Sequence, residues 1–141
     1  MKKITTLFLL IFYQISFAQE NNTITIDWID GEYNVNETTK VNLPHFNSDS
    51  FIYDDIKKTI FYSKKIEVGY FIDEKSIIIT NVVFETISDD KLSNLDKQNI
   101  PSDVNATAQN ANARDTNFAL IAFSPIIKEG NVFKKDRKSV V

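Results

Sequence analysis

Cysteine is absent from this chain of 141 residues, histidine occurs once and glycine occurs three times. Without cysteine the chain has neither a disulfide framework nor a thiol nucleophile. His45 is the single imidazole, so a histidine metal site or catalytic pair cannot draw on a second one. Gly31, Gly69 and Gly130 stand too far apart to form a phosphate-binding loop. We therefore predict that this chain is not an enzyme and carries no catalytic residue, metal site or cofactor.

The N-terminus has the three parts of a secretory signal peptide. Two lysines open it, residues 4–13 are mostly apolar, and small residues at positions 16 and 18 precede a cleavage site between Ala18 and Gln19. The apolar run is shorter than the roughly 20 residues that a membrane span needs. We predict residues 1–18 to be a signal peptide and the protein to be exported without a transmembrane span. A buried N-terminal helix or strand is the alternative.

Removal of this peptide would leave 141 − 18 = 123 residues, a length that suits one domain. We therefore predict a single β-rich module over residues 19–141. The whole chain has 16 basic and 19 acidic residues, a net charge of −3. Losing the two lysines of the peptide gives 14 − 19 = −5. This acidic balance argues against a nucleic acid partner.

Alternation of polar and apolar residues marks the first strand. Thr23–Ile29 places Ile24, Ile26 and Trp28 on one face, which is the pattern of a half-buried strand. The shared face favours a core position for Trp28 over a ligand platform. An Asp-Gly turn signal follows, after which we expect Tyr33–Val35 to return as the second arm of a hairpin.

Acidic residues gather around this turn, at Asp27, Asp30 and Glu32. Their spacing does not match that of a calcium-binding EF-hand loop. We interpret them as the solvated tip of a hairpin. Calcium binding and a small hydrolase built on carboxylates are the alternatives.

The rest of the chain is rich in short β-prone runs. Ser76–Ile87 is the densest in β-branched residues and is apolar on both faces, which predicts a central strand. Ser88–Leu92 is typical of a capped helical turn. Val104–Ala113 is ambiguous, and we favour a strand because a helix there would have no large apolar residue to bury. The other predicted strands are Phe51–Tyr53, Thr59–Tyr62, Ile66–Ile72, Phe118–Phe123 and Val132–Phe133.

Turn signals separate these strands. Pro125 ends the strand before it, and Gly130 lies in a turn that leads into Val132. Lys134–Lys138 is predicted to be a solvated edge strand, since lysine on an edge blocks unwanted pairing. About eight short strands with at most one short helix predict an all-β fold, a β-sandwich-like antiparallel module.

Six segments, in order along the chain, form a distinctive series. They are Ser16–Gln19, Thr23–Trp28, Ile77–Ser88, Ile100-Pro101, Ala113–Asp115 and Pro125–Lys135. Together they resemble the N-terminal region of the type IX secretion sortases, which are gingipain-like cysteine peptidases of the C25 class. The resemblance covers nearly the whole predicted mature chain, and none of its segments is a catalytic signature.

The resemblance implies a part in processing C-terminal sorting signals of cargo at the outer membrane of a Gram-negative bacterium. The Cys–His pair of the family belongs to a later domain, so the matching region here is expected to be non-catalytic. Expected partners are a downstream peptidase domain or outer-membrane secretion components. The matching segments supply four structural or docking candidates: Trp28, Arg114, Asp115 and Pro125.

The last residues depart from the family pattern. After Lys135 the family pattern implies an alternating apolar strand, whereas Asp136–Val141 is largely polar. We therefore expect a gene fragment whose C-terminal end is truncated. The alternative is a free-standing secreted β-sandwich of the cell envelope that binds a glycan or a protein, on the periplasmic or the outer face.

Overall fold

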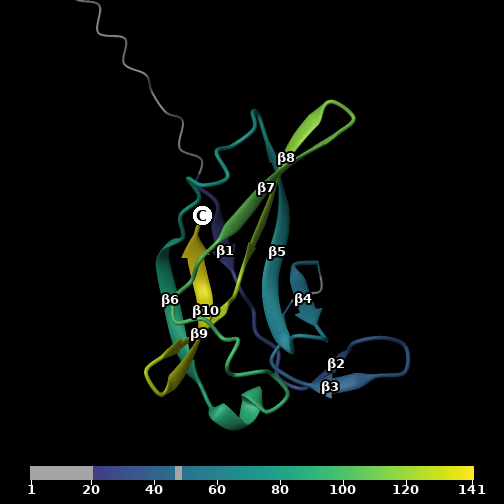
Figure 1. The fold of residues 1–141 in the computed structure, drawn as a ribbon, viewed down its shortest axis with the longest axis vertical. Helices are drawn as coiled ribbons and strands as arrows, with labels where there is room; N and C mark the ends of the chain where they lie inside the picture. Colours follow the sequence, from purple (N-terminus) through teal and green to yellow (C-terminus); the bar gives the residue numbers. More distant parts are fainter. Residues whose placement is uncertain (1–20, 47–48) are drawn as a thin grey trace, which may run out of the picture.

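The computed structural model describes residues 21–46 and 49–141 (Figure 1). These residues form ten strands and one short 3-10 helix, η1 (Asp89–Leu92), which confirms the all-β class. Ten strands replace the predicted eight in part because β2 (Glu32–Asn34) and β3 (Lys40–Asn42) form a small hairpin of their own. The predicted signal peptide and its cleavage site between Ala18 and Gln19 lie outside the described residues. Among the described residues, no helix is long and apolar enough to cross a membrane.

The other eight strands form two antiparallel sheets of four strands each (Figure 1). In the first sheet, β10 lies in the middle and pairs with β6, β9 and β1. In the second sheet the strand order is β4-β5-β8-β7. The first sheet consists of β1 (Thr23–Thr25), β6 (Thr80–Ile87), β9 (Ile126–Glu129) and β10 (Val132–Val140). The second consists of β4 (Phe51–Asp54), β5 (Thr59–Val68), β7 (Thr107–Ala113) and β8 (Thr116–Phe123).

A single large core joins the two sheets. Ile24 on β1 and Ile26 just after it are buried in the same cluster as Tyr62 from β5 and Phe123 from β8. The rings of Tyr62 and Phe123 stack with their centroids 5.0 Å apart. Leu92 of η1 closes the lower end of this core and is fully buried. Burial of these large side chains between the sheets is the main stabilising term, and it makes the module a β-sandwich.

Two strands occupy each other's expected places in the first sheet. Ser76–Ile87 was expected to hold a central strand, but β6 lies at the edge, and Val83 is 52% exposed. Lys134–Lys138 was expected at an edge, but it belongs to the central strand β10. The side chain of Lys135 is buried, with its Nζ 5.6 Å from the ring centre of Trp28. Lysine stems pack like aliphatic side chains, so a lysine-rich strand is not confined to an edge.

The predicted hairpin between Thr23–Ile29 and Tyr33–Val35 is wrong. Tyr33 lies in β2 and pairs with β3, whereas β1 pairs with β10. Gly31 adopts a φ of +134°, which sends the chain away from the first strand. The first strand therefore finds its partner more than a hundred residues along the chain, where no turn signal points to it.

Several other predictions of strands, turns and the short helix are confirmed. Val104–Ala113 contains β7, Phe118–Phe123 lies in β8, and residues 88–92 contain η1. The two predicted runs Thr59–Tyr62 and Ile66–Ile72 belong largely to one strand, β5. Gly130 has a φ of +60° in the turn between β9 and β10.

Candidate functional site

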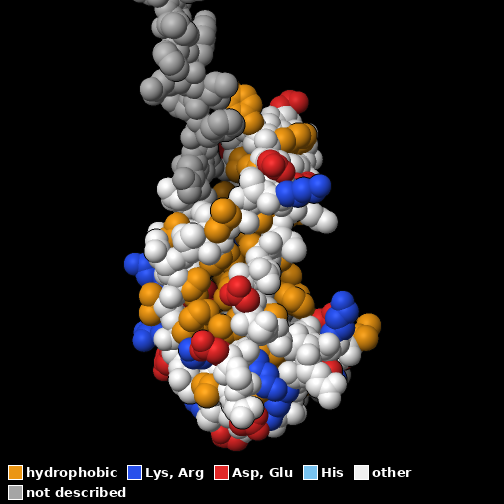
Figure 2. Space-filling view, turned by 60° about the vertical axis from the view of Figure 1, so that its left-hand side comes forward, with side chains coloured by type: hydrophobic (Ala, Val, Ile, Leu, Met, Phe, Trp, Pro, Cys, Tyr) orange, Lys and Arg blue, Asp and Glu red, His pale blue; other side chains and the backbone are white. Residues whose placement is uncertain are grey.

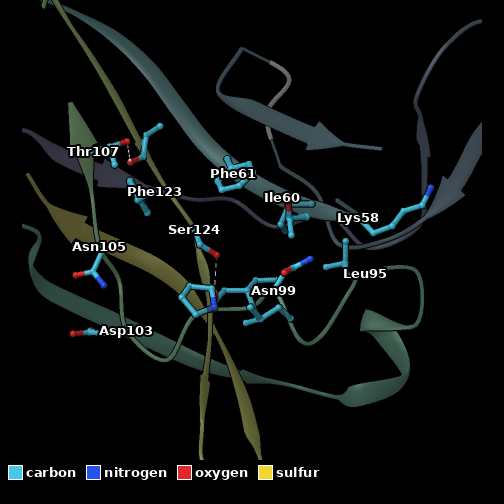
Figure 3. A pocket seen from close by; sticks show the side chains of 15 residues that line it. Lys58, Ile60, Phe61, Leu95, Asn99, Asp103, Asn105, Thr107, Phe123 and Ser124 are labelled. Carbon is cyan, nitrogen blue, oxygen red and sulfur yellow. Dashed lines mark hydrogen bonds between the residues drawn. The ribbon is translucent and has the colours of Figure 1, made fainter. Parts of the chain in front are cut away.

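A groove of about 340 Å³ opens beside the first half of β5, at the point where β8 ends (Figure 3). Pro125 lies two residues after the last residue of β8 and has no N–H to continue the pairing with β5. Its carbonyl instead accepts a hydrogen bond from the amide of Asp136, at 2.8 Å, on the first sheet. The chain thus leaves the second sheet at Pro125 and crosses to the first. The groove occupies the place that a longer β8 would fill.

Apolar side chains form the floor of the groove. Leu95, Phe123 and Ile126 are all buried and belong to the main core. The wall opposite β5 comes from the connection between η1 and β7, with Asp103 and Asn105 at its rim (Figure 3). A volume of this size lies at the lower end of the range for sites that hold a small ligand or a few side chains.

Two backbone hydrogen bonds fix this connection in place. The amide of Asp96 donates to the carbonyl of Lys58 at 2.8 Å, next to β5. The amide of Lys128, in β9, donates to the carbonyl of Pro101 at 2.8 Å. The connection is therefore tied to both sheets, so the groove has fixed walls.

Most polar groups that line the groove already have partners within the chain. The hydroxyl of Thr107 donates to the carbonyl of Ala122 at 3.2 Å, and that of Ser124 donates to the carbonyl of Ile126 at 2.8 Å (Figure 3). The hydroxyl of Thr59 is different, because it is buried and has no hydrogen-bond partner in the described part of the chain. This hydroxyl is enclosed by the chain, so it costs some stability and offers no open contact to a ligand.

Charge is confined to the rim. Lys58 lies at one end, where its Nζ is 2.6 Å from the Asp55 carboxylate. This hydrogen bond raises the pKa of Lys58 above its ordinary value. Asp103 lies on the opposite wall and accepts a hydrogen bond from the amide of Val104 at 2.8 Å. An uncharged floor between two exposed charges suits an occupant with apolar side chains and no net charge.

The candidate residue Trp28 belongs to the core rather than to this groove. Its ring meets Phe46 edge-on at 5.2 Å, and its Nε1 donates a hydrogen bond to the carbonyl of Asp136 at 2.6 Å. The indole therefore packs against the core and ties the segment after β1 to β10, as expected of a core side chain.

The other candidates lie at opposite ends of β8. Arg114 and Asp115 form the exposed two-residue turn between β7 and β8, with φ angles of +50° and +66°. These angles are typical of the type I′ turn, which twists as the two strands do. Pro125 is fully buried at the other end of β8, beside the groove. The structure thus brings Pro125 to the groove and leaves Arg114 and Asp115 far from it.

Two of the three acidic residues around the first turn, Asp30 and Glu32, pair with lysines. Asp30 lies 2.5 Å from the Nζ of Lys91, which holds the pKa of Asp30 below its ordinary value. Glu32 lies 3.3 Å from the Nζ of Lys40. In residues 21–46 and 49–141, no three aspartate, glutamate or histidine side chains are placed to hold a metal ion.

Asp136 is a buried carboxyl group that the sequence does not reveal. Neither its two carboxyl oxygens nor the hydroxyl of nearby Ser139 has a hydrogen-bond partner in the described part. Burial raises the pKa of Asp136, and the Ser139 hydroxyl and the Lys138 amide nearby partly oppose this rise. The run Asp-Arg-Lys-Ser is typical of a solvated strand, so no pattern marks Asp136 as interior.

Fold and site together define an all-β sandwich with an apolar groove between its sheets. No protein-family model, curated protein or solved structure matches this chain. The resemblance to the type IX secretion sortases therefore stays a prediction.

Proposed function

We propose that this chain is a non-catalytic binding module that holds a segment of a protein partner. The observation that carries this proposal is the groove beside β5, with its apolar floor and its walls tied to both sheets. Apolar side chains of the partner would fill the groove and displace water from its mainly apolar lining, which is the usual source of affinity at such sites.

We further propose that this module is exported and works as the N-terminal part of a type IX secretion sortase. Two segments of the resemblance supply walls of the groove. Ile100-Pro101 lies on the wall between η1 and β7, and Pro125–Lys135 begins where β8 leaves β5. In this proposal the partner is the downstream peptidase domain or a secretion component of the outer membrane. The sorting of cargo then belongs to the whole sortase, and this module positions one of its parts.

A secreted β-sandwich that binds a glycan is the second candidate. The half-buried ring of Phe61 lines the groove together with the amide side chains of Asn99 and Asn105. Aromatic rings and amides are the side chains on which sugars stack and form hydrogen bonds. Asn99, however, already donates to the carboxylate of Asp96 at 2.8 Å, which leaves fewer polar groups free for a sugar.

Two experiments test the proposed function. The reading frames after codon 141 are expected to encode a C25-type peptidase, and their absence in every frame would reject the sortase assignment. That peptidase region is then co-expressed with the chain. We expect it to co-purify with the wild type but not with Asn105→Trp, which places a large ring over the groove. Asn131→Trp is the control, because Asn131 is also exposed but lies outside the groove. Equal recovery with both variants would reject the groove as the binding site.

A further inference from the structure

β6 is a long, free edge of the first sheet. It spans eight residues and pairs only with β10, so its other side has no strand opposite it in the described chain. The edge of the second sheet, at β7, is by contrast partly covered by the segment before β6. There the amide of Asn110 donates to the carboxylate of Glu74 at 2.7 Å, and the amide of Ile72 donates to the side chain of Asn110 at 2.9 Å. Proteins usually protect edges with such covers, with proline, with lysine or with β-bulges. β6 contains no proline or lysine, and its one bulge lies near its beginning, at Asn81, where φ is +52°.

The register of β10 tells which way the backbone groups of β6 point. In an antiparallel strand the N–H and C=O of one residue point to the same neighbour, and successive residues alternate. The amide of Asp136 donates to the carbonyl of Pro125, on the side of β9. Lys135 therefore points to the other side, where it pairs with Glu85 of β6.

The same argument holds beyond the bulge in β10. The carbonyl of Arg137 accepts from the amide of Ile26 at 3.0 Å, on the side of β1. Lys138 therefore points to β6, where it pairs with Val83. Because Glu85 and Val83 direct their backbone groups to β10, the alternate residues direct theirs outward. These are Val82, Phe84 and Thr86.

Side chains along this edge are also incompletely covered. Val83 is 52% exposed, Ile78 just before β6 is 68% exposed, and Val82 and Phe84 are half-buried. Figure 2, which brings this side of the molecule forward, shows hydrophobic side chains reaching the surface along much of its length. Only one residue of β6, Glu85, is charged.

We propose that a second copy of this chain pairs with β6 as an antiparallel strand about a two-fold axis at Phe84. In this register Phe84 lies opposite Phe84 of the second copy, and Val82 lies opposite Thr86. All three outward residues then form hydrogen-bonded pairs, each with two N–H···O=C bonds. Glu85 lies opposite Val83 of the second copy, so no like charges meet. The two first sheets become one continuous sheet.

The neighbouring registers are less favourable. An axis at Glu85 would place the two Glu85 carboxylates opposite each other, which is destabilising. An axis at Val83 would leave Thr86 opposite Thr80, whose backbone groups point to β10, so fewer hydrogen bonds could form. The backbone pattern and the single charge of β6 thus select the axis at Phe84. This dimer goes beyond the proposed function, because β6 takes no part in the groove, and each dimer would present two grooves.

The test uses charge at Val83 to identify the register. Sedimentation equilibrium of the purified chain is expected to show a monomer–dimer equilibrium. In the proposed register residue 83 lies opposite Glu85 of the second copy. Val83→Glu is therefore expected to weaken the dimer about tenfold, and Val83→Lys to strengthen it by a similar factor. Glu85→Lys added to Val83→Glu is expected to restore the dimer. Val132→Glu, at an exposed site on β10, is the control.

Hydrogen exchange places the interface independently. The amides of Val82, Phe84 and Thr86 are expected to gain protection as the chain concentration rises, while those of the groove do not. A chain that stays monomeric at millimolar concentration overturns the proposal, as does equal weakening by Val83→Glu and Val83→Lys. A third outcome is that the chain stays monomeric and its three amides gain protection only when an acetylated Thr-Val octapeptide is added. In that case the edge binds a strand of another protein, and the proposed dimer is rejected. None of these outcomes bears on the groove, which Asn105→Trp tests separately.

Discussion

The buried carboxyl group of Asp136 is expected to destabilise the folded protein at neutral pH. The side chain is fully buried, and neither carboxyl oxygen has a hydrogen-bond partner in the described part of the chain. A buried polar group without partners costs about 1–3 kcal/mol. Asp136→Leu has a similar shape and no polar group, so we expect it to raise the free energy of unfolding at pH 7 by about that amount. Asp136→Asn should give a smaller gain, because its amide also lacks partners.

The pH dependence follows from the direction of the pKa shift. Burial raises the pKa of Asp136 above its unfolded value of 3.8, so between the two pKa values the folded chain binds more protons than the unfolded chain. Below pH 3.8 the carboxyl group is protonated in both states, and its destabilising effect is smallest there. The effect grows as the pH rises toward the folded pKa, because the favourable proton binding of the folded state is lost. The advantage of Asp136→Leu over the wild type should accordingly grow across that interval and then level off.

Urea unfolding followed by tryptophan fluorescence, repeated across the acidic and neutral range, measures this difference. Asp27→Asn is the control, because Asp27 is an exposed carboxylate and its removal should leave the pH profile almost unchanged. Parallel profiles for the wild type and Asp136→Leu would refute the reasoning. A loss of stability in Asp136→Leu at pH 7 would also refute it, since it would mean that the carboxylate has stabilising partners.

Three further predictions concern other parts of the chain. Mass spectrometry of the protein exported from its host is expected to find Gln19 as the first residue, and a retained N-terminus would reject the signal peptide. Trp28→Phe removes the donor to the Asp136 carbonyl and should lower the free energy of unfolding by about 1–2 kcal/mol. Urea unfolding followed by circular dichroism measures this change, and an unchanged value would contradict the hydrogen bond. Arg114→Asn combined with Asp115→Gly suits the positive φ angles of the turn and should raise the melting temperature, by about 1 kcal/mol of stability; a lower melting temperature would argue against a type I′ turn.

Local patterns in the sequence predict local structure well in this chain. The strand favoured within Val104–Ala113, the apolar run Phe118–Phe123 and the Gly130 turn all form as expected. Each of these depends on residues that are close together in the sequence. The spacing of apolar residues and the residue types found in turns are therefore sufficient to identify them.

Local patterns do not predict which strands pair with each other, because pairing depends on contacts between residues that are distant in the sequence. β6 has the composition of a central strand, yet its position is decided by β10, which follows about fifty residues later. The groove has a signal in Pro125, but that signal marks only the end of a strand. The groove also needs Ile100-Pro101 opposite β5, and only the tertiary fold brings these residues there. Asp136 shows the same limit, since its burial results from the sheet around it.

The central position of β10 also determines the order in which the sandwich can form. The strands of the second sheet lie between Phe51 and Phe123, so this sheet can assemble while the last residues are still being synthesised. The first sheet cannot, because β1 and β6 have no partner until β10 emerges. Closing β1 onto β10 joins residues 23 and 140, and such distant pairings slow folding. Until then Ile24 and Ile26 lack the cover that the assembled first sheet gives them, so this half of the core is the last to close.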